Sequence, residues 1–471
     1  MLHISTRGEA PALSFTDAML AGLARDGGLY VPETWPSLGR TEIAAFAGRP
    51  YPEVAAAVLR RLTGGEFADA DLVRMIDDAY AGFRHPATCP LVQIGDGLFV
   101  QELFHGPTLA FKDVAMQLLG RMMESALAAR GRRATIVGAT SGDTGSAAVA
   151  AFEGSSRVDV FILYPHGRVS DVQRRQMTTI AAENIHTVAI EGSFDDCQAI
   201  VKALFGRTAF RDEMQLSGVN SINWARIAAQ AVYYVTAAVA LGSPHRPVSF
   251  AVPTGNFGDV LAGWVAKRMG LPIERLVIAT NANDILARTL ATGRYEVTAV
   301  VPTTSPSMDI QVSSNFERLL FEAHGRDPEA VRRLMAGLAQ SGSFAIADAP
   351  LAAIRAEFEG HAVPESEVEN EIGRTWREAG YLLDPHTAIA VRAARAHLAA
   401  DPHVPVVALA TAHPAKFPDA VLRASGMRPA LPPHLAELMT QPERITILPN
   451  DPAAVEAHIR REARAVRNHA A

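Results

Sequence analysis

The feature that most constrains the fold is an alternation of apolar, β-branched runs with helical stretches, which starts near residue 95. The runs lie at residues 134–137, 158–163, 186–190, 248–252, 276–280 and 404–409, and helical stretches at 146–152, 169–182, 196–205, 224–241 and 259–269 separate most of them. Such alternation predicts the α/β class, with parallel sheets that carry helices on both faces. Folds of this class bind ligands where loops leave the carboxyl ends of strands. The loops that follow these runs are therefore the first places to expect a functional site.

The chain has 471 residues, enough for two or three structural units, since domains usually hold about 100–200 residues. Residues 1–85 are expected to form an N-terminal, mostly helical unit. We expect residues 86–430 to form the core, with two parallel-sheet α/β units, of which the smaller spans about 120–215. The stretch 324–402 is expected to be mostly helical. Residues 431–471 are expected to be an extension that holds a strand at 444–448 and a helix at 453–466.

Composition excludes several classes of protein. Lys and Arg total 44 and Asp and Glu total 50, so the net charge of −6 argues against a protein that coats nucleic acid. The longest apolar stretch, residues 228–241, falls short of the roughly 20 residues that span a bilayer, and no secretory signal is visible. Two cysteines, Cys89 and Cys197, supply neither a disulfide framework nor a four-cysteine zinc site. We therefore expect a cytoplasmic protein that binds no nucleic acid, membrane or metal.

Lysine is scarce, because only four of the 44 basic residues are lysine: Lys112, Lys202, Lys267 and Lys416. A lysine that persists among arginines is a candidate for chemistry that arginine cannot do, such as nucleophilic attack by a neutral amine. Lys112 follows a Gly-Pro turn and begins an apolar helix at 114–119. The helix dipole and an apolar environment both lower the pKa of an ammonium there. The alternative is a surface lysine whose stem packs on apolar neighbours.

Two loops between a strand and a helix have the composition of anion cradles. The first loop follows the strand at 134–137 and the second follows the strand at 248–252. Their glycines let the backbone approach a ligand, and free N–H groups at a helix start favour a carboxylate or phosphate. The second loop matches neither a Walker A sequence nor the dinucleotide fingerprint, which favours a ligand with a single phosphate there. The alternative for the first loop is a turn with a helix cap. The residues are Ser141, Gly142, Asp143, Thr144, Gly145 and Ser146 in the first loop and Gly255, Asn256, Phe257 and Gly258 in the second.

Two further segments carry polar side chains at strand or helix ends. Thr411 follows the strand at 404–409, where its hydroxyl could bond a ring nitrogen or be satisfied by backbone. Ser221 and Arg226 lie near a helix start and form either an oxyanion clamp or a capped helix with an exposed arginine. His386 is interpreted as part of a helix cap. Cys197 lies beside two aspartates that raise the pKa of its thiol, which makes it a poor nucleophile.

Five motifs in order, HGPTLAFKD, ATSGDTGSAA, NSINWAR, PTGNFGD and TAHPAKF, resemble those of the threonine synthase family, in its long bacterial and fungal branch. The N-terminal segments STRGE and LARDGGLYVP are similar to the same branch. The resemblance implies fold type II of the pyridoxal-phosphate enzymes, the tryptophan synthase β-like fold. It also implies conversion of O-phospho-L-homoserine and water to L-threonine and phosphate by γ-elimination and β-addition of water, the last step of threonine biosynthesis.

The resemblance also implies a role for each matched residue. Lys112 matches the lysine that holds pyridoxal 5′-phosphate covalently, and Thr411 the hydroxyl that faces the pyridine nitrogen. Asp143 stands where many relatives of this fold have asparagine near the 3′-oxygen of the cofactor. The remaining matches are Phe111 beside the cofactor, Gly255, Asn256, Phe257 and Gly258 around its phosphate, Ser141, Gly142 and Thr144 at the substrate carboxylate, and Ser221 and Arg226 at the substrate phosphate.

Two alternatives stay open at this point. A phospholyase or dehydratase on the same fold would share Lys112 and the phosphate loop and release an α-keto acid and ammonia. A non-catalytic phosphometabolite-binding protein would keep the fold, although an intact Lys112 argues against it. The resemblance implies a monomer, with a homodimer as the alternative.

Overall fold

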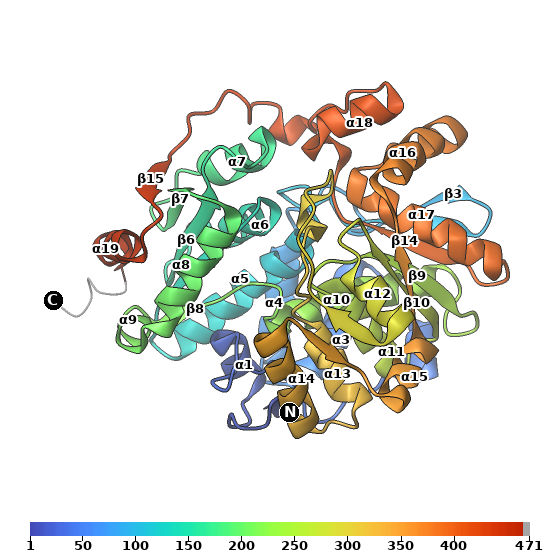
Figure 1. Ribbon diagram of the computed structural model, residues 1–471, viewed down its shortest axis with the longest axis horizontal. Helices are drawn as coiled ribbons and strands as arrows, with labels where there is room; N and C mark the ends of the chain where they lie inside the picture. The colour runs from blue at the N-terminus through green and yellow to red at the C-terminus, as the bar shows by residue number, and fades with distance from the viewer. Residues whose placement is uncertain (465–471) are drawn as a thin grey trace.

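The computed structural model describes residues 1–464, and two large sheets organise this part of the chain (Figure 1). In Figure 1 a five-stranded sheet lies on the left and a six-stranded sheet on the right, with helix α5 (Lys112–Ala129) between them. Both sheets are predominantly parallel, so the predicted α/β class is confirmed.

The smaller sheet has the strand order β15-β7-β6-β5-β8, and every neighbouring pair is parallel. All eight residues of β6 are buried, as expected for a strand covered on both faces. The strands are β5 (Ala134–Ala139), β6 (Val158–Pro165), β7 (Ile185–Glu191), β8 (Leu216–Ser217) and β15 (Thr446–Pro449). The helices near this sheet are α6 (Asp143–Phe152), α7 (Asp171–Thr178), α8 (Phe194–Gly206), α9 (Thr208–Glu213) and α19 (Pro452–Glu462).

The larger sheet has the order β13-β10-β9-β14-β4-β3, and only the β3–β4 pair is antiparallel. The strands are β3 (Leu91–Gly95), β4 (Leu98–Glu102), β9 (Val248–Pro253), β10 (Ile273–Thr280), β13 (Phe358–Ala362) and β14 (Val406–Ala410). Helices α10 (Trp224–Ala240), α11 (Gly258–Arg268), α12 (Ile285–Thr292), α15 (Asp348–Glu357), α16 (Glu365–Ala379), α17 (Pro385–Ala400) and α18 (Pro418–Ser425) surround it.

Strand β14 shows why the larger sheet needs helices on both faces. Val407 and Leu409 point into the core that α10 and α11 share, whereas Val406 and Ala408 point into the core under α17. Successive side chains of a strand alternate between its faces, so a strand that is apolar at every position is stable only when both faces are covered.

The N-terminal residues pack on the core through α10. Strands β1 (His3–Ser5) and β2 (Tyr30–Pro32) pair antiparallel, and helices α1 (Phe15–Ala21), α2 (Arg40–Ala45), α3 (Tyr51–Leu62) and α4 (Asp69–Tyr80) follow the helical pattern of the sequence. Apolar residues of these helices belong to the same hydrophobic cluster as Trp224 and Tyr233 of α10. The remaining elements are β11 (Arg294–Glu296), α13 (Phe316–Ala323), α14 (Pro328–Ser341), β12 (Ser343–Ala345) and the 3₁₀ turns η1 (Pro306–Met308), η2 (Pro414–Lys416) and η3 (Pro433–Leu435).

Three details differ from the sequence prediction. Strand β13 lies inside the stretch that was expected to be mostly helical, and it forms an edge of the six-stranded sheet. The predicted helix at 169–182 ends at Thr178, where a β-branched run of Thr178, Thr179 and Ile180 disfavours helix. The predicted C-terminal helix ends at Glu462, and its expected last two residues, 465 and 466, lie outside the described part.

None of the helices within residues 1–464 combines the length and the apolar composition that a bilayer crossing requires.

Candidate active site

The β4–α5 loop places Lys112 at the first turn of α5. The backbone N–H of Phe111 donates to the carbonyl of Thr411 at 2.8 Å, which ties the loop to the end of β14. Leu109 adopts a left-handed backbone with φ of 61°, an unusual conformation for a side chain of its size. Inside the loop, the carboxylate of Asp113 accepts bonds from the N–H and the hydroxyl of Thr108 at 2.8 and 2.7 Å. The loop therefore holds Lys112 in one place through contacts from several directions.

Lys112 is buried, and its Nζ lies 3.4 Å from Oδ2 of Asp143. The Nζ also lies 4.9 Å from the centre of the Phe111 ring, which places the ammonium over an aromatic face. Burial lowers the pKa of Lys112, Asp143 opposes this effect, and the positive charges of Arg226 and Lys416 lower the pKa further. The predicted direction is confirmed, with burial as its main cause and with two nearby cations that the sequence did not indicate.

Asp143 is the charged centre of the first loop and the first residue of α6. Its Oδ1 accepts bonds from Nζ of Lys416 at 2.9 Å and from Nε2 of Gln173 at 2.8 Å. Its Oδ2 faces Lys112 and accepts a bond from the hydroxyl of Ser307 at 3.3 Å. Burial alone would raise the pKa of Asp143, but Lys416 and then Lys112 hold it well below its usual value. Asp143 is therefore an ionised group between two lysines.

The rest of this loop is shaped by Thr140, whose hydroxyl accepts bonds from the N–H groups of Gly142 and Gly145, both at 2.9 Å. Gly142 has φ of 143°, and a Cβ there would lie 2.5 Å from the side chain of Gln173. Within residues 1–464 the hydroxyls of Ser141 and Thr144 make no hydrogen bond to protein groups. These two hydroxyls are the groups of the loop that can bind a ligand carboxylate.

The second loop follows β9 and opens α11. Phe257 has φ of 63°, and the backbone N–H groups of the four loop residues find no acceptor in the described part of the chain. A Cβ on Gly258 would lie at ordinary contact distance, 3.8–4.0 Å, from Asn315, Ile227 and Ser221, so this residue packs against those side chains. Unpaired N–H groups at a helix start suit a phosphate group. The loop thus fits the cofactor phosphate that the sequence resemblance implies.

Asn315 joins this loop to the Ser221 segment. Its side-chain nitrogen donates to the carbonyl of Asn256 at 3.0 Å and to the carbonyl of Ser221 at 3.1 Å. Ser221 lies beside Gly258, since a Cβ on Gly258 would be 4.0 Å from the Cβ of Ser221. The two segments therefore form adjacent walls of one site.

Arg226 is buried, with an exposed fraction of 3%, so the alternative of an exposed arginine is wrong. Its Nη1 donates to the carbonyl of Val219 at 3.1 Å, and its buried Nε has no hydrogen-bond partner. No carboxylate in residues 1–464 lies within ion-pair distance of it, and burial lowers its pKa to about 10. Asp259 offsets its charge only from beyond ion-pair distance. A buried guanidinium without an ion-pair partner is costly, which is expected where an anionic ligand supplies the charge.

Thr411 immediately follows β14, as predicted, and its side chain is buried. Its carbonyl is used by Phe111, whereas its hydroxyl makes no hydrogen bond to the residues that the structure describes. The hydroxyl is thus available to a ligand atom.

Comparisons with known proteins agree with this geometry. The family model described as "Pyridoxal-phosphate dependent enzyme" matches residues 87–411, and those described as "Threonine synthase N terminus" and "Threonine synthase, C-terminal" match residues 2–80 and 387–459. A threonine synthase of Pseudomonas aeruginosa is 54% identical over 460 residues, which cover 98% of both chains. The chain belongs to the threonine synthase family. A crystal structure of a threonine synthase from Brucella melitensis, described as bound to pyridoxal phosphate, has a TM-score of 0.96 at 60% identity and covers 99% of this chain and 100% of that one. The yeast threonine synthase structure has a TM-score of 0.92 at 40% identity, with 98% of each chain covered.

Membership of the threonine synthase family confirms several predictions made from the motifs. The fold is type II, the enzyme is a lyase of threonine biosynthesis, and its cofactor is pyridoxal 5′-phosphate. Its substrate is a small molecule. Within residues 1–464 no group of three histidine, cysteine, aspartate or glutamate side chains could hold a metal ion.

Sequence reasoning missed three residues of this threonine synthase site. Ser307 and Asn315 come from the segment between β11 and α13, which carries no motif. Lys416 lies in the TAHPAKF motif but received no role, although it is one of only four lysines. Lysine scarcity was the signal that could have found it.

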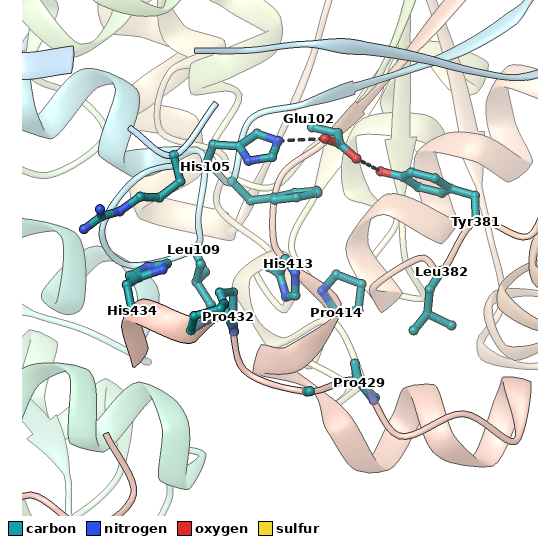
Figure 2. A pocket seen from close by; sticks show the side chains of 14 residues that line it. Glu102, His105, Leu109, Tyr381, Leu382, His413, Pro414, Pro429, Pro432 and His434 are labelled. Carbon is teal, nitrogen blue, oxygen red and sulfur yellow. Dashed lines mark hydrogen bonds and ion pairs between the residues drawn. The ribbon is translucent and has the colours of Figure 1, made fainter. Parts of the chain in front are cut away.

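A cavity of about 730 Å³ lies beside the site but does not contain Lys112 (Figure 2). Figure 2 shows Glu102 between His105 and Tyr381, with hydrogen bonds of 2.7 and 2.8 Å. Leu109 and His413 form another part of its lining. The cavity therefore shares the β4–α5 loop and the loop after β14 with the site around Lys112.

Proposed function

We propose that the chain converts O-phospho-L-homoserine and water to L-threonine and phosphate at the site around Lys112. The observation that carries the proposal is Arg226, a buried cation near Lys112 that has no ion-pair partner among the described residues, together with the anion-binding loop at 255–258 and the hydroxyls of Ser141 and Thr144. This site can neutralise three anionic groups. The cofactor brings one phosphate, and the substrate brings a carboxylate and a second phosphate.

The residues present fit pyridoxal 5′-phosphate. Lys112 supplies an amine whose lowered pKa favours the neutral, nucleophilic form. The unpaired N–H groups at 255–258 suit the cofactor phosphate, and the hydroxyl of Thr411 suits the ring nitrogen. Phe111 lies beside Lys112, with its ring centre 4.9 Å from Nζ. When bound, the cofactor withdraws electrons from the carbon skeleton of the substrate.

The substrate is held at both ends. We assign its carboxylate to the hydroxyls of Ser141 and Thr144, because the N–H of Gly142 is already used by Thr140. We assign its phosphate to Arg226 and Ser221, since the guanidinium supplies the missing positive charge. Ser221 is near enough to Gly258 to contact the cofactor phosphate as well. Two-point binding fixes the carbon chain between the two anions and next to Nζ of Lys112.

Lys112 is then the group that moves protons. Its Nζ removes the proton from the α-carbon and returns one there after water has added at the β-carbon. Such shuttling needs an amine that gains and loses a proton near neutral pH, and burial with Arg226 and Lys416 nearby lowers the pKa of Lys112 in that direction. Asp143 stabilises the protonated amine from 3.4 Å.

Product identification tests the proposal directly. The purified holoenzyme with O-phospho-L-homoserine should release threonine and phosphate in equal amounts, with little α-ketobutyrate. α-Ketobutyrate and ammonia as main products would favour the phospholyase or dehydratase alternative. Absence of a visible absorption band after incubation with the cofactor would favour the non-catalytic alternative.

The cytoplasmic location and the monomeric state, with a homodimer as the alternative, remain predictions. Light scattering coupled to size-exclusion chromatography measures the oligomeric state.

A further inference from the structure

Lys416 is a buried lysine that none of the proposed steps uses. It ends η2, which lies in the loop after β14, and its exposed fraction is 0%. Its Nζ donates to the carbonyl of Thr108 at 2.7 Å and to Oε1 of Gln176 at 3.0 Å, and it lies 2.9 Å from Oδ1 of Asp143. An ammonium has three donors, so all three are used. Lys416 thus joins the β4–α5 loop, α7 and α6 at one nitrogen.

Asp143 depends on this contact for its charge. Its only two ion-pair partners in the described residues are Lys416 and Lys112. Lys112 is the farther of the two and loses its positive charge whenever it acts as a neutral amine. Lys416 has no such task, so it is the permanent counter-charge of a carboxylate that is 3% exposed. A buried carboxylate without a counter-charge takes up a proton.

The two oxygens of Asp143 are also divided between two tasks. Oδ1 is held by Lys416 and Gln173, whereas Oδ2 is left for Lys112 and Ser307. This division fixes the rotation of the carboxylate.

We propose that Lys416 is a positioning residue of the proposed reaction, which keeps Asp143 ionised and turned so that Oδ2 faces Lys112. The inference rests on the proposed function of Lys112, but it concerns Lys416, to which no role in the reaction has been given above. Lys416 touches neither substrate nor the reacting atoms in this scheme and acts through Asp143.

The geometry explains why this position holds lysine in a chain with 40 arginines among 44 basic residues. Three acceptors converge on one nitrogen atom, which suits a compact ammonium. A guanidinium spreads its donors over a planar fork, so it would have to displace the carbonyl of Thr108 or the side chain of Gln176.

The test must consider every charged group that faces Lys112. These groups are Asp143 on α6, Arg226 on α10, Asp259 on α11 and Lys416 on η2. Lys416→Met removes one of them and leaves Asp143 without its permanent partner. The pH dependence of the visible band of the holoenzyme should then gain an ionisation step that the wild type lacks, because the pKa of Asp143 rises when its counter-charge is removed.

Three further variants sharpen the measurement. In the double variant with Asp143→Asn, Lys416→Met should produce no new step, because the titrating group is gone. Lys416→Arg keeps the charge and should show the wild-type number of steps, with kcat still reduced about tenfold because Asp143 is misplaced. Lys202→Met on the exposed face of α8 is the matched control and should leave the profile unchanged.

A second readout needs no cofactor. Lys112 also pairs with Asp143, so this measurement is made in a cofactor-free Lys112→Met background. There, Lys416→Met should make the free energy of unfolding fall as pH rises, because burial without either counter-charge raises the pKa of Asp143 above its unfolded value. Asp143→Asn added to Lys416→Met should restore stability, since replacing both charges avoids a lone buried charge. If the double variant is no more stable than Lys416→Met, the counter-charge role is overturned. This includes the case in which both variants are unfolded.

The outcomes separate this inference from the proposed function. Threonine formation by Lys416→Met with a wild-type pH profile overturns the inference and leaves the proposed function in place. A new step that disappears with Asp143→Asn supports the inference even if the product is α-ketobutyrate, which would overturn only the proposed function.

Discussion

Arg226 should make the cofactor-free protein less stable than it would be without this arginine. The guanidinium is buried, has one hydrogen bond to a carbonyl and leaves Nε unpaired. Burial lowers its pKa from 12.5 to about 10, and each pKa unit corresponds to about 1.4 kcal/mol. The charged form therefore costs the folded state about 3 kcal/mol. Because the folded pKa lies below the unfolded one, this cost is present at every pH below about 10 and decreases as pH rises from there towards 12.5.

Arg226→Met removes the buried charge and keeps much of the side-chain volume. The carbonyl of Val219 loses its hydrogen bond, which costs about 1 kcal/mol. We therefore expect the cofactor-free variant to be more stable than the wild type by about 2 kcal/mol at pH 7. Its affinity for O-phospho-L-homoserine should fall by about 10- to 150-fold, since a charge-assisted hydrogen bond contributes about 1.5–3 kcal/mol.

Urea unfolding of the cofactor-free proteins measures the stability difference, and competition binding with phosphorylated and unphosphorylated homoserine measures the affinities. Arg132→Met, at an exposed arginine, is the matched control and should change neither quantity. A destabilised Arg226→Met would refute the argument that this charge waits for an anion. Equal weakening of both ligands would show that Arg226 does not bind the substrate phosphate.

Three further predictions concern neighbouring groups. Borohydride reduction of the holoenzyme followed by peptide mapping should label Lys112, and Lys112→Arg should lose both the label and the visible band. Label on Lys416, whose Nζ already has three partners, would contradict the assignment. Gly258→Val should weaken cofactor binding in equilibrium dialysis at least about tenfold, or about 1.4 kcal/mol, because a Cβ there already contacts Asn315, Ile227 and Ser221 and the larger valine would displace the loop; unchanged binding would remove the loop from the phosphate site. Burial raises the pKa of Asp259 from 3.8 to about 7, so wild-type stability should fall as pH rises from about 4 to 7, and Asp259→Asn should lose this slope in urea unfolding at pH 5 and 8.

The sheets were predictable because their strands are buried on both faces. Strands such as β6 and β9 are apolar at nearly every position, so their existence follows from composition over a few residues. Strand β13 has no such signal. Its Gly360 packs against α12, where a Cβ would lie 3.0 Å from Cα of Ala287. The close approach of α12 requires a glycine at position 360. Because glycine has no side chain, the strand lacks the apolar pattern by which a strand is recognised in a sequence.

The site was predictable where its chemistry lies in continuous segments. Lys112, the loop at 255–258 and Thr411 each follow a strand or begin a helix, and the structure places them as the motifs indicated. The burial of Arg226 was not predictable, because an arginine near a helix start is usually exposed. Asn315 was missed because its role consists of bonds to Asn256 and Ser221, which are distant in sequence.

Asp143 connects two features of the sequence. One is the scarcity of lysine, and the other is an aspartate at a position where many relatives of this fold have asparagine. Of the four lysines, Lys112 and Lys416 are buried, and both lie against the carboxylate of Asp143. An asparagine at this position would need no counter-charge, whereas a buried aspartate needs one to remain ionised. Asp143 and Lys416 therefore form a unit that cannot be changed one member at a time without leaving a charge buried alone. The scarcity of lysine indicated Lys112, whose neutral amine can act as a nucleophile. The same scarcity indicates Lys416, whose compact ammonium can meet three acceptors at one nitrogen.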